Sequence, residues 1–210
     1  MLNHLNKIFS QKSISSIALL LVASVFIFIL PLFQEVNIWI MVILFSSIIF
    51  LATFSISARM VYIGLGAIIL EILSKTTDFI YLHYVAEFVS NVTIIIIVGY
   101  VILEMMKRKK VNMYTLIEAI NGYLLLGIMF MSLVSFCDQY IIGSYKGVTE
   151  ASMDIPYYTI ITLTTAGYGD ITPTLPIAKS LSMFIAVTGQ FYVAVIVAII
   201  VGKYSNNAQE

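Results

Sequence analysis

Charged side chains are scarce in this chain. Only 10% of its 210 residues are Asp, Glu, Lys or Arg, whereas soluble domains carry about 25%. Hydrophobic residues make up 60% of the chain, and the mean hydropathy is +1.02. The formal net charge is zero with a pI near 6.7, so the sequence offers no basic surface for a nucleic acid. This composition predicts an integral membrane protein and excludes nucleic acid as a partner.

Cysteine and histidine are nearly absent. The only cysteine, Cys137, cannot form a disulfide within the chain. With two histidines, His4 and His83, the sequence lacks the clustered ligands or nucleophiles that a membrane enzyme requires. We therefore expect no enzymatic activity and no cofactor.

Long apolar stretches predict the transmembrane helices, because a helix needs roughly 20 apolar residues to cross a bilayer. We expect six spans, at about 14–33, 36–57, 60–74, 79–106, 116–137 and 177–201. No clear cleavage site follows the first stretch, so we interpret it as a retained helix rather than a signal peptide.

The distribution of Lys and Arg predicts the orientation, since cytoplasmic loops carry the excess of positive charge. With the N-terminus inside, the cytoplasmic residues are Lys7, Lys12, Arg59, Lys107, Arg108, Lys109, Lys110 and Lys203. The outer residues are Lys75, Lys146 and Lys179. We therefore expect a multi-pass protein of the plasma membrane with both termini in the cytoplasm.

The basic run Lys107, Arg108, Lys109 and Lys110 has two interpretations. It could bind anionic lipid headgroups, at about 1 kcal/mol per charge. It could also be a topology anchor and linker between the fourth and fifth spans, and this is the interpretation we favour.

The fourth span contains no Arg or Lys between residues 79 and 106. Voltage sensors carry several arginines there, because moved charge does the gating work, so conventional voltage sensing is not expected. The span does carry His83, Glu87 and Asn91 at a spacing of four residues, which places them on one helix face, and Glu71 lies in the third span. They are either a proton or cation sensor or a polar seam between helices, and we favour the seam.

A short helix is predicted over residues 154–164. Asp154 is suited to cap it, and Pro156 fits the first turn. At 1.5 Å per residue it spans only about 16 Å, so it cannot cross the bilayer. A half-helix followed by a strand is the expected form of a re-entrant loop.

The segment that follows reads Thr164-Thr165-Ala166-Gly167-Tyr168-Gly169-Asp170. If successive carbonyls are to face one axis, the backbone must alternate between right- and left-handed regions, and glycine adopts the left-handed region without strain. We expect left-handed backbone at Gly167 and Gly169. Stacked rings of carbonyl oxygens can then replace the hydration shell of a cation.

This segment resembles the selectivity filter of tetrameric potassium channels, Thr-Val-Gly-Tyr-Gly, with Ala166 in place of the valine. The resemblance implies an all-α membrane protein: six transmembrane helices, a re-entrant pore helix and a filter loop, with four identical subunits around a pore. It places K⁺ at Thr165, Ala166, Gly167 and Tyr168, with Gly169 completing the filter. Thr164, Tyr158 and Asp170 would support the filter.

The resemblance also implies roles for individual side chains. Tyr158 stands where relatives place an aromatic residue that braces the filter tyrosine, here Tyr168. Ile161 replaces a glutamate that pairs with the filter aspartate in some relatives, so we expect Asp170 to find another partner or face water. Gly189 is either the gating hinge of the last span or a glycine for close packing.

These expectations divide the chain into a peripheral domain at 1–110, a pore domain at 111–205 and a short cytoplasmic tail at 206–210. The predicted function is passive, K⁺-selective conduction by a homotetramer that is not conventionally voltage-gated. Two alternatives stay open: a non-selective cation channel, because Ala166 is small, and a non-conducting regulatory subunit of a related channel.

Overall fold

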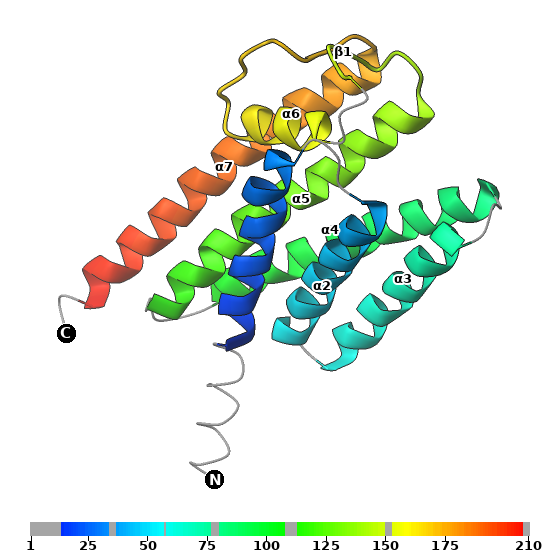
Figure 1. The fold of residues 1–210 in the computed structure, drawn as a ribbon. Coiled ribbons are helices and arrows are strands. Elements are labelled where there is room, and N and C mark those ends of the chain that lie inside the picture. Colours follow the sequence, from blue (N-terminus) through cyan, green and yellow to red (C-terminus); the bar gives the residue numbers. More distant parts are fainter. Residues whose placement is uncertain are drawn as a thin grey trace.

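The computed structural model describes residues 14–33, 37–56, 58–76, 80–107, 113–149 and 153–207, and its long elements are all helical (Figure 1). The first helix covers Ile14–Leu32 and ends in a π turn, Val25–Ile29, and a 3₁₀ turn, Leu30–Leu32, that contains Pro31. The others are α2 Ile38–Ile56, α3 Ala58–Thr76, α4 Ile80–Lys107, α5 Met113–Tyr140, α6 Asp154–Leu163 and α7 Pro176–Asn207.

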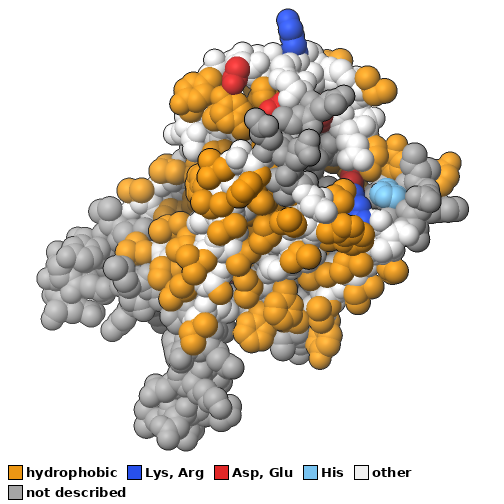
Figure 2. Space-filling model, in the orientation of Figure 1, with side chains coloured by type: hydrophobic (Ala, Val, Ile, Leu, Met, Phe, Trp, Pro, Cys, Tyr) orange, Lys and Arg blue, Asp and Glu red, His pale blue; other side chains and the backbone are white. Residues whose placement is uncertain are grey.

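Among the described residues, five helices are long and apolar enough to cross a membrane: the first helix, α2, α4, α5 and α7. The apolar part of α3, Met60–Leu73, is shorter, so the sixth crossing stays a prediction. Apolar side chains cover much of the visible surface (Figure 2). Phe28, Tyr62 and Phe191 are each more than half exposed. Soluble monomers rarely expose apolar surface on this scale, which fits a chain surrounded by lipid.

Helix α5 is the centre of the chain. It lies between α6 and α7 on one side and α2, α3 and α4 on the other (Figure 1). In an 18-residue apolar window within Thr115–Tyr140, 67% of the residues are buried, against 17% in the corresponding window of α7, within Pro176–Ile199. Phe130, Leu125 and Ile128 on α5 are almost fully buried. The core of this single chain is therefore built around α5, and α7 leaves most of its apolar surface uncovered.

Polar contacts tie two other helices to the first half of α5. Asn121 Nδ2 donates a hydrogen bond of 2.8 Å to the Ser16 carbonyl on the first helix. The Tyr192 hydroxyl on α7 donates a bond of 2.6 Å to the Ala119 carbonyl. A Cβ at Gly122 would lie 2.3 Å from that hydroxyl, so glycine makes room for it.

The short helix α6 packs against both α5 and α7. Its last residue, Leu163, is fully buried. A Cβ placed on Gly189 of α7 would lie 2.1 Å from the Leu163 carbonyl oxygen, which no side chain tolerates. Gly189 thus serves close packing between α7 and the end of α6. Its use as a gating hinge stays a prediction.

Two details differ from the expectations. Besides the helices, which agree with the all-α class, the chain has a short antiparallel ladder that was not expected, in which β1 Tyr145–Lys146 pairs with β2 Thr172–Pro173. Asp154 does not cap α6: Met153 is the cap residue, and Asp154 is the first residue of the helix. Its carboxylate instead accepts bonds from the Thr149 backbone N–H (2.6 Å) and hydroxyl (2.7 Å), because the preceding loop folds back onto it.

The close contact at Gly189 is testable. Gly189→Ala forces α7 away from α6, and we expect it to cost about 1–3 kcal/mol, as overpacked cores do. The measurement is the unfolding temperature of the detergent-solubilised protein, which should fall. Gly99→Ala on α4 is the matched control, because nothing lies within 4 Å of the added carbon and alanine favours a helix. If both variants unfold at the wild-type temperature, Gly189 is not needed for packing, and its interpretation as a gating hinge is favoured.

Candidate functional site

The predicted site residues lie directly after the C-terminal end of α6, in residues 164–170, which we call the Gly-Tyr-Gly loop. Thr164 closes the helix: its backbone N–H and its hydroxyl both donate to the Ile160 carbonyl, at 2.9 and 2.8 Å. The C-terminal end of a helix carries partial negative charge. The loop therefore begins at a point whose electrostatic field favours a cation.

The backbone of the loop changes hand at every second residue. φ is +61° at Thr165, +51° at Gly167 and +82° at Gly169, whereas Ala166 and Tyr168 have ordinary negative values. The left-handed glycines were expected from the sequence; left-handed Thr165 was not. A residue with a β-carbon pays about 1–2 kcal/mol for this conformation, so the surrounding contacts must hold Thr165 in place.

Three hydrogen bonds hold the first part of the loop. The Thr165 N–H donates to the Thr162 carbonyl at 3.0 Å, and the Gly167 N–H donates to the Ile161 carbonyl at 3.1 Å. Gln190 of α7 donates from Nε2 to the Thr165 hydroxyl oxygen at 3.1 Å. Each bond contributes roughly 0.5–1.5 kcal/mol, which is the scale of the strain at Thr165.

Asp170 has a hydrogen-bond partner that could not be identified from the sequence. The Tyr157 hydroxyl donates to Asp170 Oδ2 at 2.7 Å, and the Ile171 N–H donates to Oδ1 at 3.1 Å. The Tyr157 bond is the largest of the effects that lower the pKa of Asp170, and in return it raises the pKa of Tyr157 to about 12. Of the two expectations for Asp170, a partner within the chain or exposure to water, the structure thus gives it a partner, Tyr157.

Tyr158 is buried within the subunit. Its hydroxyl and that of Ser182 on α7 are 2.5 Å apart, and its ring packs edge-on against Tyr145 with centroids 5.1 Å apart. Tyr168, by contrast, is 75% exposed in the single chain. Tyr158 therefore joins α6 to α7 and β1. Its contact with Tyr168 stays a prediction.

The far end of the loop is fixed by the segment between α5 and α6. The β1–β2 ladder pairs Tyr145 with Pro173. Gly147, with φ +91°, lies so close that an added Cβ would be 2.3 Å from the Asp170 carbonyl oxygen. The Thr174 N–H donates to the Ser144 carbonyl at 2.8 Å. The exit of the loop is therefore clamped on both sides.

The polar residues of α3 and α4 form a paired seam. Lys75 Nζ lies 3.6 Å from Glu87 Oε1, and the Ser90 hydroxyl donates to Glu71 at 2.8 Å. Within the described residues, no group of three or more His, Cys, Asp or Glu side chains is placed to hold a metal ion. These pairs agree with the seam interpretation. Arg108, Lys109 and Lys110, the greater part of the predicted lipid-binding run, lie outside the described residues.

The helical architecture and the apolar spans define the class: this is a multi-pass helical membrane protein. Residues 122–206 match the family model described as an ion channel. This match covers most of α5, α6, the Gly-Tyr-Gly loop and nearly all of α7, and it supports an ion channel family and ion transport rather than catalysis. No curated protein and no solved structure matches the chain.

The Tyr157–Asp170 bond predicts a dependence on pH. The bond lowers the pKa of Asp170. The stability that the bond gives the loop is therefore fully present above the ordinary aspartate pKa and is lost as the pH falls through the lowered pKa. In Tyr157→Phe the pKa of Asp170 returns toward its ordinary value. The loop should therefore loosen at a higher pH than in the wild type. Hydrogen exchange of the 164–170 amides, followed by mass spectrometry during acidification, measures this.

Tyr62→Phe on α3 is the control, since Tyr62 is 77% exposed and far along the chain from the loop. Its exchange profile should overlay that of the wild type. Identical profiles for Tyr157→Phe and the wild type would show that the bond does not stabilise the loop.

Proposed function

We propose that this chain forms a homotetrameric, K⁺-selective channel in the plasma membrane, with the Gly-Tyr-Gly loop as its selectivity filter. The observation that carries the proposal is the alternating hand of the backbone at Thr165, Gly167 and Gly169. This alternation is what turns successive carbonyls toward one axis, where rings of oxygens replace the hydration shell of K⁺. The ion sites are formed by Thr165, Ala166, Gly167, Tyr168 and Gly169, with Thr164, Tyr158 and Asp170 in support.

The requirement for four chains follows from the loop and from α7. One chain supplies one strand of carbonyls, so a closed ring needs several copies. Most of the apolar stretch of α7 is unburied in the single chain, with Phe184, Val187 and Phe191 exposed. Packing against other subunits and lining a central pore accounts for this surface.

The orientation and the mode of opening follow from charge. The excess of Lys and Arg on one side favours both termini in the cytoplasm and the loop near the outer face. Helix α4 has no Arg or Lys before its last residue, Lys107, so the membrane potential has little charge to move. Opening is therefore not conventionally voltage-driven in this proposal.

A non-selective cation channel is the second candidate, and Ala166 is the observation that favours it. Alanine supplies the same carbonyl as the valine of the filter pattern but less bulk behind it. A looser filter would hold its oxygens less firmly and discriminate less between K⁺ and Na⁺.

The reversal potential of the purified protein in planar bilayers, under opposed K⁺ and Na⁺ gradients, tests both candidates. We expect reversal close to the K⁺ equilibrium potential, because the carbonyl positions do not depend on the side chain at 166. Ala166→Val should reverse at the same potential. A wild-type reversal near zero that Ala166→Val moves toward the K⁺ value would instead establish the non-selective channel. No current alone, but current when a related filter-bearing chain is added, would point to a regulatory subunit.

A further inference from the structure

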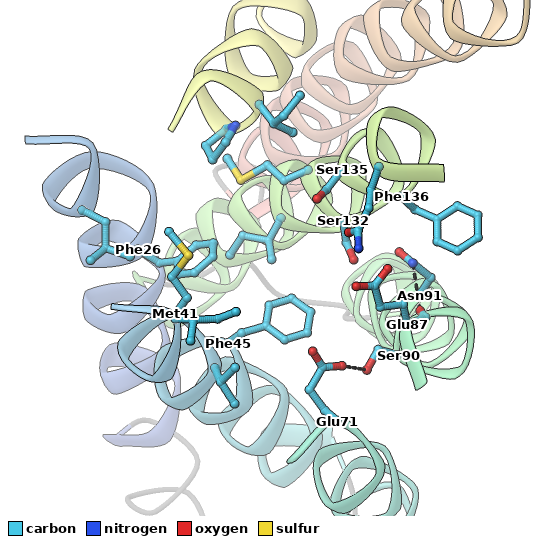
Figure 3. Close-up of a pocket in the computed structure, with 18 of the residues that line it drawn as sticks. Phe26, Met41, Phe45, Glu71, Glu87, Ser90, Asn91, Ser132, Ser135 and Phe136 are labelled. Atoms are coloured by element: carbon cyan, nitrogen blue, oxygen red, sulfur yellow. Dashed lines mark hydrogen bonds between the residues drawn. The ribbon is translucent and has the colours of Figure 1, made fainter. Parts of the chain in front are cut away.

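A cavity of about 320 Å³ lies between the first helix, α2, α3, α4, α5 and the start of α6. Its lining changes character from one side to the other (Figure 3). Glu71, Glu87, Ser90 and Asn91 gather on the side of α3 and α4, whereas Phe26 and Met41 lie on the side of the first helix and α2. The cavity is therefore amphipathic, with one polar end and one apolar end.

Among the charged side chains that line the polar end, acidic ones outnumber basic ones. The charged side chains that line the cavity are Glu71 and Glu87 on one hand and Lys75 on the other. Lys75 Nζ is 3.6 Å from Glu87, and the Ser90 hydroxyl donates to Glu71 at 2.8 Å. A cationic ligand head would meet both carboxylates there, and hydrogen bonds between charged groups are among the strong ones.

Asn91 adds an unsatisfied acceptor to the same wall. Its side chain is 95% buried, and its Nδ2 donates to the Glu87 carbonyl at 2.9 Å. Its Oδ1 has no hydrogen-bond partner. Native proteins rarely leave a buried acceptor unpaired, so the wall of this cavity is prepared to accept a further hydrogen bond.

Two carboxylates and the unpaired Asn91 oxygen offer acceptors to a ligand head that donates, beside the donor-bearing side chains of Lys75, Ser132, Ser135 and Gln139. A primary ammonium group has three N–H donors and no acceptor. A bare metal ion fits less well, since no group of three or more His, Cys, Asp or Glu side chains among the described residues is placed to hold one. The apolar end and the volume, at the lower end of the range of small-molecule sites, suit a short alkyl chain attached to that head.

We propose that this cavity binds an amphiphile with a primary alkylammonium head, the ammonium group lying against Glu71, Glu87 and Asn91 and the alkyl chain against Phe26 and Met41. A free long-chain amine and the ethanolamine head of a phospholipid share this chemistry. The bound amphiphile would also touch Ile155 and Pro156 in the first turn of α6, the helix that leads into the Gly-Tyr-Gly loop. The binding itself does not depend on the proposed conduction.

The test is equilibrium binding of radiolabelled octylammonium to the full chain in phosphatidylcholine nanodiscs, with empty nanodiscs as the background. We expect saturable binding that octyltrimethylammonium and 1-octanol compete for poorly, because the first cannot donate hydrogen bonds and the second carries no charge. Glu71→Gln removes a charge-assisted bond and should weaken binding at least about tenfold. Glu104→Gln is the matched control: it lies on α4 outside the cavity and should bind like the wild type.

Ser132→Phe provides a second variant, because Ser132 lines the cavity from α5 and the larger ring fills it without changing charge. It should abolish binding while the protein still elutes as the wild type does in size exclusion.

Replacing half the lipid by phosphatidylethanolamine separates the two sources: reduced octylammonium binding assigns the site to the lipid head, and unchanged binding assigns it to a free amine. Binding that is absent in the wild type, unaffected by both variants, or equally strong for 1-octanol would overturn the proposal. Because no current is measured, this result stands apart from the test of conduction.

Discussion

The left-handed backbone of Thr165, Gly167 and Gly169 is the constraint on which the rest of the site depends. Two glycines meet it without strain, but Thr165 does not. The compensating bonds come from two elements: the end of α6 supplies carbonyl acceptors for the loop N–H groups, and α7 supplies the Gln190 amide for the Thr165 hydroxyl. Gly189, next to Gln190, lets α7 come close enough to Leu163 for this bond to form. The loop conformation is thus a product of helix packing as much as of its own sequence.

The uneven burial of α5 and α7 supports the proposal that several chains share one pore. In an 18-residue apolar window of α5, 67% of the residues are buried inside the chain, and in that of α7 only 17%. Lipid could cover the exposed face of α7, but the loop next to it carries Tyr168, which is 75% exposed, and a strained polar backbone. Such a backbone is tolerated at membrane depth only where protein buries it or water lines it. A pore shared between subunits, as proposed, meets both requirements, and lipid alone meets neither.

Apolar stretches and glycine positions could be read from the sequence because they report local physics. The helices follow the predicted spans closely, α6 ends within one residue of its expected end, and Gly167 and Gly169 are left-handed as expected. What the sequence did not reveal depends on contacts between distant segments. The β1–β2 ladder, left-handed Thr165 and the Tyr157–Asp170 bond each need a partner placed by the fold. Asp154 was misassigned for the same reason: a good capping residue was drawn instead to Thr149 by the returning loop.

The structure also narrows how the peripheral helices can act on the loop. Moving one charge through 100 mV yields about 2.3 kcal/mol, and α4 has no Lys or Arg before its last residue, which supports the proposal that opening is not conventionally voltage-driven. The peripheral helices and the loop nevertheless share one rigid element, since α6 is only 10 residues long, roughly 15 Å. Its first turn forms part of the amphipathic cavity, and its last residues hold the loop. A ligand bound there, as proposed, would act on the same helix that positions Thr165.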